Sequence, residues 1–179
     1  MQIKDIVEFD KSRYFGGAIQ ANWFYDPQKA KAIASSYVFH GPKYHGISES
    51  ENANSKYKLF DTASYALDLF KRANDADSNK FCMTIAGYGT GKSHLAVTLA
   101  SIMSGHDERL KQCAIDRIAA VDKEIANKIS SFTGKNLVLV FNGMNNFNLD
   151  HETLEIAKTA LKQHAISDDL LNSITKQYT

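Results

Sequence analysis

Eight residues near the middle of the chain have the types and spacing of a loop that binds phosphate. They read Ala86-Gly87-Tyr88-Gly89-Thr90-Gly91-Lys92-Ser93, which is the Walker A order with Ala in place of the first glycine. Glycines permit backbone angles that a β-carbon would forbid, so successive N–H groups can turn toward one anion. The spacing therefore predicts a site for the phosphates of a nucleotide.

The side chains of this loop have predicted roles. Lys92 is expected to place its ammonium against the β and γ phosphates, which makes it the catalytic residue of the set. The hydroxyl of Ser93 is expected to bind the Mg²⁺ ion that bridges these phosphates. The predicted cofactors are thus ATP and Mg²⁺, and the predicted contact residues are Gly87, Tyr88, Gly89, Thr90, Gly91, Lys92, Ser93 and His94.

The segments on either side of the loop match the context that the motif requires. Residues 81–85, Phe-Cys-Met-Thr-Ile, predict a buried strand in which Cys82 packs in the core. Residues 94–103 predict a helix with a broad apolar face, for which Gly105 is a suitable stop. Strand, glycine loop and helix is the order in which phosphate loops occur.

Further elements predict the fold class. Residues 136–141, Asn-Leu-Val-Leu-Val-Phe, are apolar on both faces and predict a central parallel strand. Helical periodicity or start signals mark the ranges 27–34, 61–74, 107–132, 150–163 and 168–177, and residues 37–39 predict a short strand. The expected fold is α/β, an AAA-like P-loop NTPase with a parallel sheet flanked by helices and a core that is incomplete.

A polar stretch at residues 47–56 suggests a boundary between a lead-in segment, residues 1–50, and a nucleotide-binding domain, residues 51–179. No carboxylate follows the strand at 137–141, although hydrolysis needs an acidic residue near the magnesium ion. Two strong strands and one or two weak ones are predicted, whereas a complete P-loop ATPase core needs about five parallel strands, the size of a typical sheet. The favoured interpretation is the N-terminal part of a longer ATPase. The alternative is a small protein that binds nucleotide without hydrolysing it.

Composition narrows the class of protein. The 179 residues are 44% hydrophobic and 11% aromatic, and the net charge is +1, so a packed core is expected and overall charge favours neither nucleic acid nor an anionic membrane. The two cysteines, Cys82 and Cys113, lack metal-ligand spacing. With Cys82 expected in the core, the simple inference is a reducing, cytoplasmic location. No apolar stretch approaches the ~20 residues that span a bilayer, so no membrane partner is expected.

The order of these features resembles the N-terminus of large bacterial phage-defence ATPases. It comprises the start Met-Gln-Ile-Lys-Asp-Ile, an aromatic-rich lead-in, a helix ending near Lys71-Arg72, and the loop 87–95. The ATPases of DNA phosphorothioation-dependent Ssp systems are the most similar, followed by those of Dnd and BREX systems. The resemblance implies ATP hydrolysis that powers a restriction system against unmarked phage DNA. The implied partners are other proteins of that system, and DNA is reached through them. Whether the chain forms a homo-oligomer is left open by the resemblance.

Several alternatives remain at this point. Helicase loaders share the stretch Gly-Thr-Gly-Lys-Ser-His-Leu, so a helicase-loader-like ATPase is one of them. Another is a docking or oligomerisation module that responds to nucleotide without its own hydrolysis. A further hypothesis is that the ring of Tyr37 or Tyr44 stacks on the adenine base. The aromatic run 23–25 is expected to pack in the core or at a protein interface rather than stack on nucleic acid bases.

Overall fold

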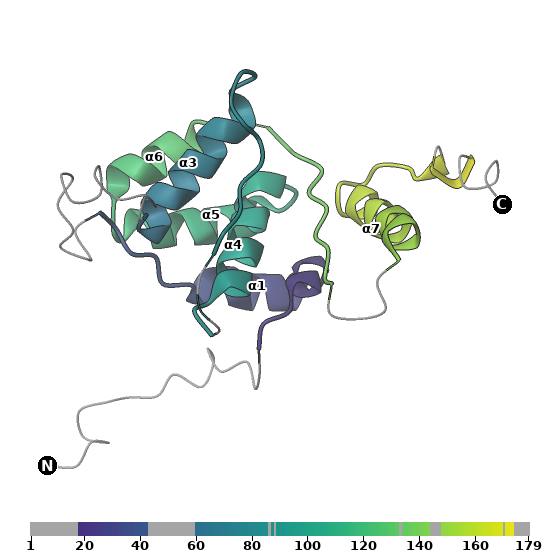
Figure 1. The fold of residues 1–179 in the computed structure, drawn as a ribbon, viewed down its shortest axis with the longest axis horizontal. Helices are drawn as coiled ribbons and strands as arrows, with labels where there is room; N and C mark the ends of the chain where they lie inside the picture. Colours follow the sequence, from purple (N-terminus) through teal and green to yellow (C-terminus); the bar gives the residue numbers. More distant parts are fainter. Residues whose placement is uncertain are drawn as a thin grey trace, which may run out of the picture.

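The computed structural model describes residues 18–42, 60–85, 87, 89–132, 134–143, 148–169 and 171–173. Across these residues the regular structure is helical, and no strand is present (Figure 1). The predicted strands at 37–39, 81–85 and 136–141 are stretches outside the helices. The prediction of an α/β P-loop fold with a parallel sheet is therefore wrong for the part of the chain that the structure describes.

The physical reason for this error is pairing. A strand becomes part of a sheet when its N–H and C=O groups form a ladder with a neighbour. An apolar run rich in β-branched and aromatic residues favours an extended backbone, but it does not supply that neighbour. One consequence concerns Cys82, whose predicted place in the core is also wrong: its side chain is exposed.

Asparagine and aspartate side chains set the starts of the α-helices, with α4 as the exception among those described. In each case the side chain accepts a hydrogen bond from a first-turn N–H, as expected of a good N-cap. The caps are Asp26, Asp61, Asp107, Asp122 and Asn148. The helices are α1 (Pro27–Ser36), α3 (Thr62–Asn74), α4 (Lys92–Ser104), α5 (Glu108–Ala119), α6 (Lys123–Ser130) and α7 (Leu149–Gln163), preceded by the 3-10 helix η3 (Ala21–Tyr25).

The single helix predicted for residues 107–132 is two helices, α5 and α6. The carboxylate of Asp122 accepts the N–H of Ile125 at 2.9 Å, and this capping contact starts a new helix after a turn at residues 120–121. The spacing of apolar residues in this range predicts one buried face. Its members on the two helices are buried, namely Leu110, Ala114, Ile118, Ile125 and Ile129, whereas Val121, in the turn between the helices, is exposed.

One core cluster joins the helix after the glycine loop to residues of the lead-in segment. Its buried side chains are Ala30, Ala34, Tyr37, Phe39, Ala63, Ala66, Phe70, Leu95, Leu99, Ile102, Leu110, Ala114, Ile115, Ile118, Ile125, Ala126 and Ile129. Residues 30–39 therefore pack in the same core as α4. The predicted boundary between residues 50 and 51 lies outside the described residues.

A second, smaller cluster lies on another side of α4. Phe24, Ile33, Val97 and Ala100 form its buried centre, and Val138 and Val140 pack against it. The N–H of Val140 donates to the hydroxyl of Tyr25 at 2.8 Å. This bond fixes the segment that contains Val138 and Val140 against η3. With a cluster on each of two sides, α4 is buried around most of its circumference, as a helix with apolar residues all round should be.

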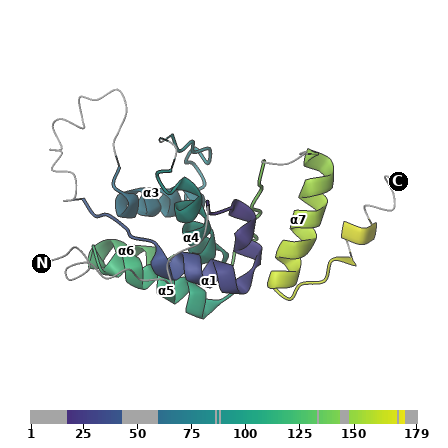
Figure 2. The same ribbon diagram turned by 90° about the horizontal axis from the view of Figure 1, so that it is seen from below.

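Helix α7 stands at one end of the molecule, beyond the segment 135–140, in both views (Figures 1 and 2). It contacts η3, and the side-chain amide of Gln163 donates to the carbonyl of Phe24 at 3.4 Å. Across the described ranges, the helices are too short or too polar for any of them to cross a bilayer.

Candidate phosphate-binding loop

The glycine loop leads from the extended segment 81–85 into the first turn of α4. Gly89 and Gly91 have φ angles of 76° and 80°, a left-handed conformation that glycine adopts at little cost and other residues avoid. Gly91 is also the N-cap of α4. The backbone angles predicted for the loop glycines are thus found at Gly89 and Gly91, whereas Gly87 does not have a positive φ. Ala86 and Tyr88 lie outside the described residues.

The ammonium of Lys92 lies within the loop. Its Nζ donates to the carbonyl oxygen of Gly87 at 2.6 Å, and the hydroxyl of Thr90 donates to the same oxygen at 2.8 Å. Two donors thus converge on one acceptor and close the loop into a compact turn. A phosphate oxygen entering the loop would compete with this carbonyl for the ammonium, and it carries the greater negative charge.

The start of α4 differs from the other described helix starts because a glycine, and not an acidic or amide side chain, precedes it. No side chain caps its first turn. The first-turn N–H groups and the positive end of the helix dipole favour an anion at this place. Ser93, the predicted magnesium ligand, is exposed in this first turn.

His94, predicted as a contact residue for the nucleotide, directs its side chain toward the end of α1. Its Nε2 lies 2.8 Å from the carbonyl oxygen of Ile33 and 3.2 Å from the hydroxyl of Ser36. Since a carbonyl can only accept, Nε2 carries the proton. Burial lowers the pKa of His94, while the bond to Ile33 raises it. The side chain thus holds the first turn of α4, which follows the loop, against α1.

The structure bears on the two aromatic hypotheses. The ring of Tyr37 is buried edge-on against Phe39 and His94, with ring centroids 4.7 and 4.9 Å apart, and burial raises its pKa. It is therefore part of the core, and Tyr44 lies outside the described residues. Core packing of the aromatic run 23–25 is confirmed at its centre, where Phe24 is buried.

The segment predicted as the second strand supplies no acidic group for hydrolysis. Residues 136–143, Asn-Leu-Val-Leu-Val-Phe-Asn-Gly, contain no carboxylate. Among the described residues, no three or more His, Cys, Asp or Glu side chains gather closely enough to hold a metal ion. A magnesium ion at this loop would rely on Ser93, phosphate oxygens and water, which suits the preference of Mg²⁺ for oxygen ligands and retained water.

The sequence did not reveal a cluster at the opposite end of α4. The hydroxyl of Ser104 lies 2.7 Å from Nδ1 of His106 and 3.2 Å from Nε2 of His164, and the two rings meet edge-on at 5.8 Å. This cluster links the end of α4 to the end of α7. Sixty residues separate Ser104 from His164, and no local pattern indicates such a contact.

Comparisons with known proteins leave the site to be judged on its geometry. No family model, no curated protein and no solved structure matches this chain.

Proposed function

We propose that residues 87–93 bind the phosphates of ATP together with Mg²⁺. The observation that carries this proposal is the Lys92 ammonium held inside a glycine turn, 2.6 Å from the Gly87 carbonyl, at a helix start that no side chain caps. A cation, a positive helix end and left-handed glycines then serve one anionic ligand. A helix start without an anionic ligand does not require a cation, an uncapped first turn and left-handed glycines at the same place.

Each residue has a distinct part in this proposal. The backbone N–H groups of the loop cradle the β-phosphate, and Lys92 exchanges its carbonyl acceptor for β and γ phosphate oxygens. The Ser93 hydroxyl holds Mg²⁺, which neutralises the remaining phosphate charge. His94 keeps the first turn of α4 in place through its bond to α1.

The proposal is limited to binding for this chain on its own. In-line attack of water on the γ-phosphate needs a group that orients the water, and the segment 136–143 supplies no carboxylate for this. We therefore expect nucleotide to bind without measurable turnover.

The wider proposal rests on the resemblance described for the sequence. In this wider proposal, the chain is part of a cytoplasmic ATPase of a bacterial anti-phage DNA restriction system, and this ATPase works with other proteins of that system. A helicase-loader-like ATPase uses the same loop and remains the alternative. The restriction-system ATPase and the helicase-loader-like ATPase both need the phosphate site, so the site is tested first.

The test is calorimetric titration of Mg²⁺ with ATP, and separately with ADP, into the chain. Lys92→Ala removes the ammonium, and Lys123→Ala is the matched control because Lys123 is an exposed lysine at the start of another helix, α6. Removing a charge-assisted contact costs about 1.5–3 kcal/mol, or roughly 10- to 150-fold in affinity. Phosphate release is followed in parallel.

The expected result is binding by the parent chain and by Lys123→Ala, a loss of at least tenfold in Lys92→Ala, and no phosphate release. Equal affinities in all three proteins would contradict a role for the loop. No binding at millimolar nucleotide would sink the proposed site altogether. Turnover by the parent chain would show that a catalytic carboxylate lies within these residues.

A further inference from the structure

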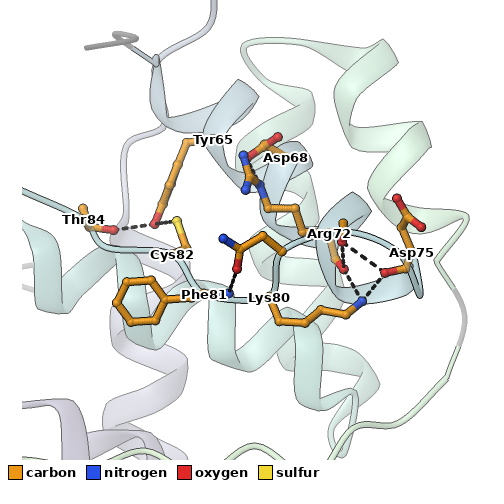
Figure 3. Close-up of polar contacts among 10 residues, drawn as sticks. Tyr65, Asp68, Arg72, Asp75, Lys80, Phe81, Cys82 and Thr84 are labelled. Carbon is orange, nitrogen blue, oxygen red and sulfur yellow. Dashed lines mark hydrogen bonds and ion pairs between the residues drawn. The ribbon is translucent and has the colours of Figure 1, made fainter. Parts of the chain in front are cut away.

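The extended segment 81–85 is anchored to α3 at its start (Figure 3). The ammonium of Lys80 donates to the carbonyl oxygens of Arg72, at 2.6 Å, and of Asp75, both at the end of α3. A lysine suits this place because the last carbonyls of a helix carry partial negative charge. The N–H of Phe81 donates to the side chain of Asn79 at 2.9 Å. The segment therefore leaves α3 in a defined direction.

Alternate residues of the segment face α3. The hydroxyl of Tyr65, on α3, contacts the thiol of Cys82 at 3.5 Å and forms a hydrogen bond with the hydroxyl of Thr84 (Figure 3). Side chains two residues apart lie on one face of an extended chain. The small polar side chains thus attach the segment to the helix through one tyrosine.

The other alternate residues are apolar and open to solvent. Phe81, Met83 and Ile85 are 71%, 67% and 83% exposed. Moreover, no main-chain N–H or C=O of residues 82–85 forms a hydrogen bond within the described part of the chain. Apolar side chains at every second position and unpaired main-chain groups are the features of an uncovered strand edge.

We propose that residues 81–85 pair with the same residues of a second copy of this chain, as antiparallel strands related by a two-fold axis at Met83. The order of the segment is large apolar, small, large apolar, small, large apolar, and so reads alike in both directions. Two-fold pairing places Phe81 opposite Ile85, Cys82 opposite Thr84 and Met83 opposite itself. Isologous pairing of this kind closes at two copies, which is the commonest symmetry of soluble oligomers.

Side-chain chemistry favours this occupant. Aromatic and β-branched residues facing each other across strands attract, and the arrangement makes this pair twice. The segment carries no charge, so like charges never oppose one another along residues 81–85. Lys80, which borders it, is held at the end of α3. Main-chain hydrogen bonds and the gathered apolar side chains then act together, as in strand addition.

The test is sedimentation equilibrium of the parent chain, of Met83→Lys and of Ile166→Lys. Ile166 is the matched control, an exposed apolar residue away from the segment. The parent chain should rise from 19.9 kDa toward twice that mass over roughly a hundredfold range of concentration, since small interfaces are weak. Ile166→Lys should behave alike and Met83→Lys should remain at the lower mass.

Two results would overturn the proposal. One is a parent chain that stays at 19.9 kDa throughout this range, which would leave the segment to a different partner. The other is a Met83→Lys protein that associates as strongly as the parent. Because Met83 is exposed, its replacement should leave the circular dichroism of the helices unchanged, so a loss of association reports on the surface.

A cross-link tests the register. In a Cys82→Ser, Cys113→Ser background, Met83→Cys should form a disulfide between two copies under mild oxidation, since Cα atoms of directly opposed residues lie about 4.5–5.5 Å apart, a separation that a disulfide can span. Phe81→Cys should not, because position 81 faces position 85. The reverse result would contradict pairing about Met83. Lys92→Ala should associate like the parent chain, which separates this proposal from that of nucleotide binding.

Discussion

At the scale of single residues, two glycines decide whether the phosphate loop can form. Replacing Gly91 by Ala puts a β-carbon on a residue with φ of 80°, which costs about 1–2 kcal/mol. We expect Gly91→Ala to lower both the free energy of unfolding, measured by urea denaturation, and the affinity for ATP.

The matched control is Gly143→Ala, because a β-carbon at Gly143 meets nothing within 4 Å and its φ is not in the left-handed range. This control should leave both quantities unchanged or raise stability slightly, since alanine reduces the freedom of the unfolded chain. If Gly91→Ala and Gly143→Ala behave alike, the loop does not require the left-handed angle at residue 91.

A second prediction at this scale concerns the histidine cluster. Burial, and then the charge of His164, lower the pKa of His106 below 6.5; Asp107 raises this pKa by a smaller amount, and Lys135 lowers it by the smallest. Between the folded and unfolded pKa values the unfolded chain binds more protons, so the free energy of unfolding falls as the pH falls. This stabilisation is complete above the unfolded pKa and is lost as the pH falls through the folded pKa.

We therefore expect His106→Gln to be less sensitive to acid than the parent chain. The measurement is urea denaturation at about pH 7.5 and pH 5.5, on either side of the unperturbed histidine pKa. The drop in unfolding free energy between the two pH values should be smaller in the variant. His94, whose pKa burial also lowers, accounts for part of the drop that remains. An identical drop would contradict the assignment to His106.

At the scale of elements, capping chemistry sets where helices begin. The carboxylate of Asp61 accepts the N–H of Ser64 at 2.8 Å and starts α3, which carries Tyr65 and holds Lys80 at its other end. Asp61→Ala should lower the unfolding free energy by about 1 kcal/mol, with a range of 0.5–2. Asp77→Ala, an exposed aspartate in the turn after α3, is the control. Equal losses in both would show that the cap contributes little.

These same elements show what a sequence can predict. The starts near Pro27, Asp61 and Gly91 and the stop at Gly105 were predictable because caps and stops are local. The break at Asp122 was missed, although an aspartate three residues before a buried isoleucine is a cap signal. The assignment of residues 81–85 and 136–141 to strands of a parallel sheet was wrong for the described residues, because a ladder depends on a partner that the segment itself does not specify. In the loop, local rules were sufficient to predict the left-handed conformation of Gly89 and Gly91. They were not sufficient to predict the contacts of His94, because its partners lie on α1.

At the scale of the whole molecule, the lead-in residues and the helix behind the loop share one core. Phe39 is almost fully buried there, while the neighbouring Val38 is exposed. Phe39→Ala should lower the unfolding free energy by about 3–5 kcal/mol, and Val38→Ala should change it by less than about 0.5 kcal/mol, as surface substitutions usually do. Chemical denaturation followed by circular dichroism measures both. A mild effect of Phe39→Ala would mean that residues 30–39 form a separable unit.

Nucleotide binding at the loop can be followed residue by residue in an amide NMR titration with Mg²⁺ and ATP. If residues 87–93 cradle the phosphates, the amide resonances of Gly87, Gly89, Gly91 and Ser93 should shift in proportion to bound nucleotide. Those of α7 should not move, and Lys92→Ala should weaken the response at least tenfold. Saturable shifts only elsewhere in the chain, or no shifts at millimolar nucleotide, would show that residues 87–93 do not bind the phosphates.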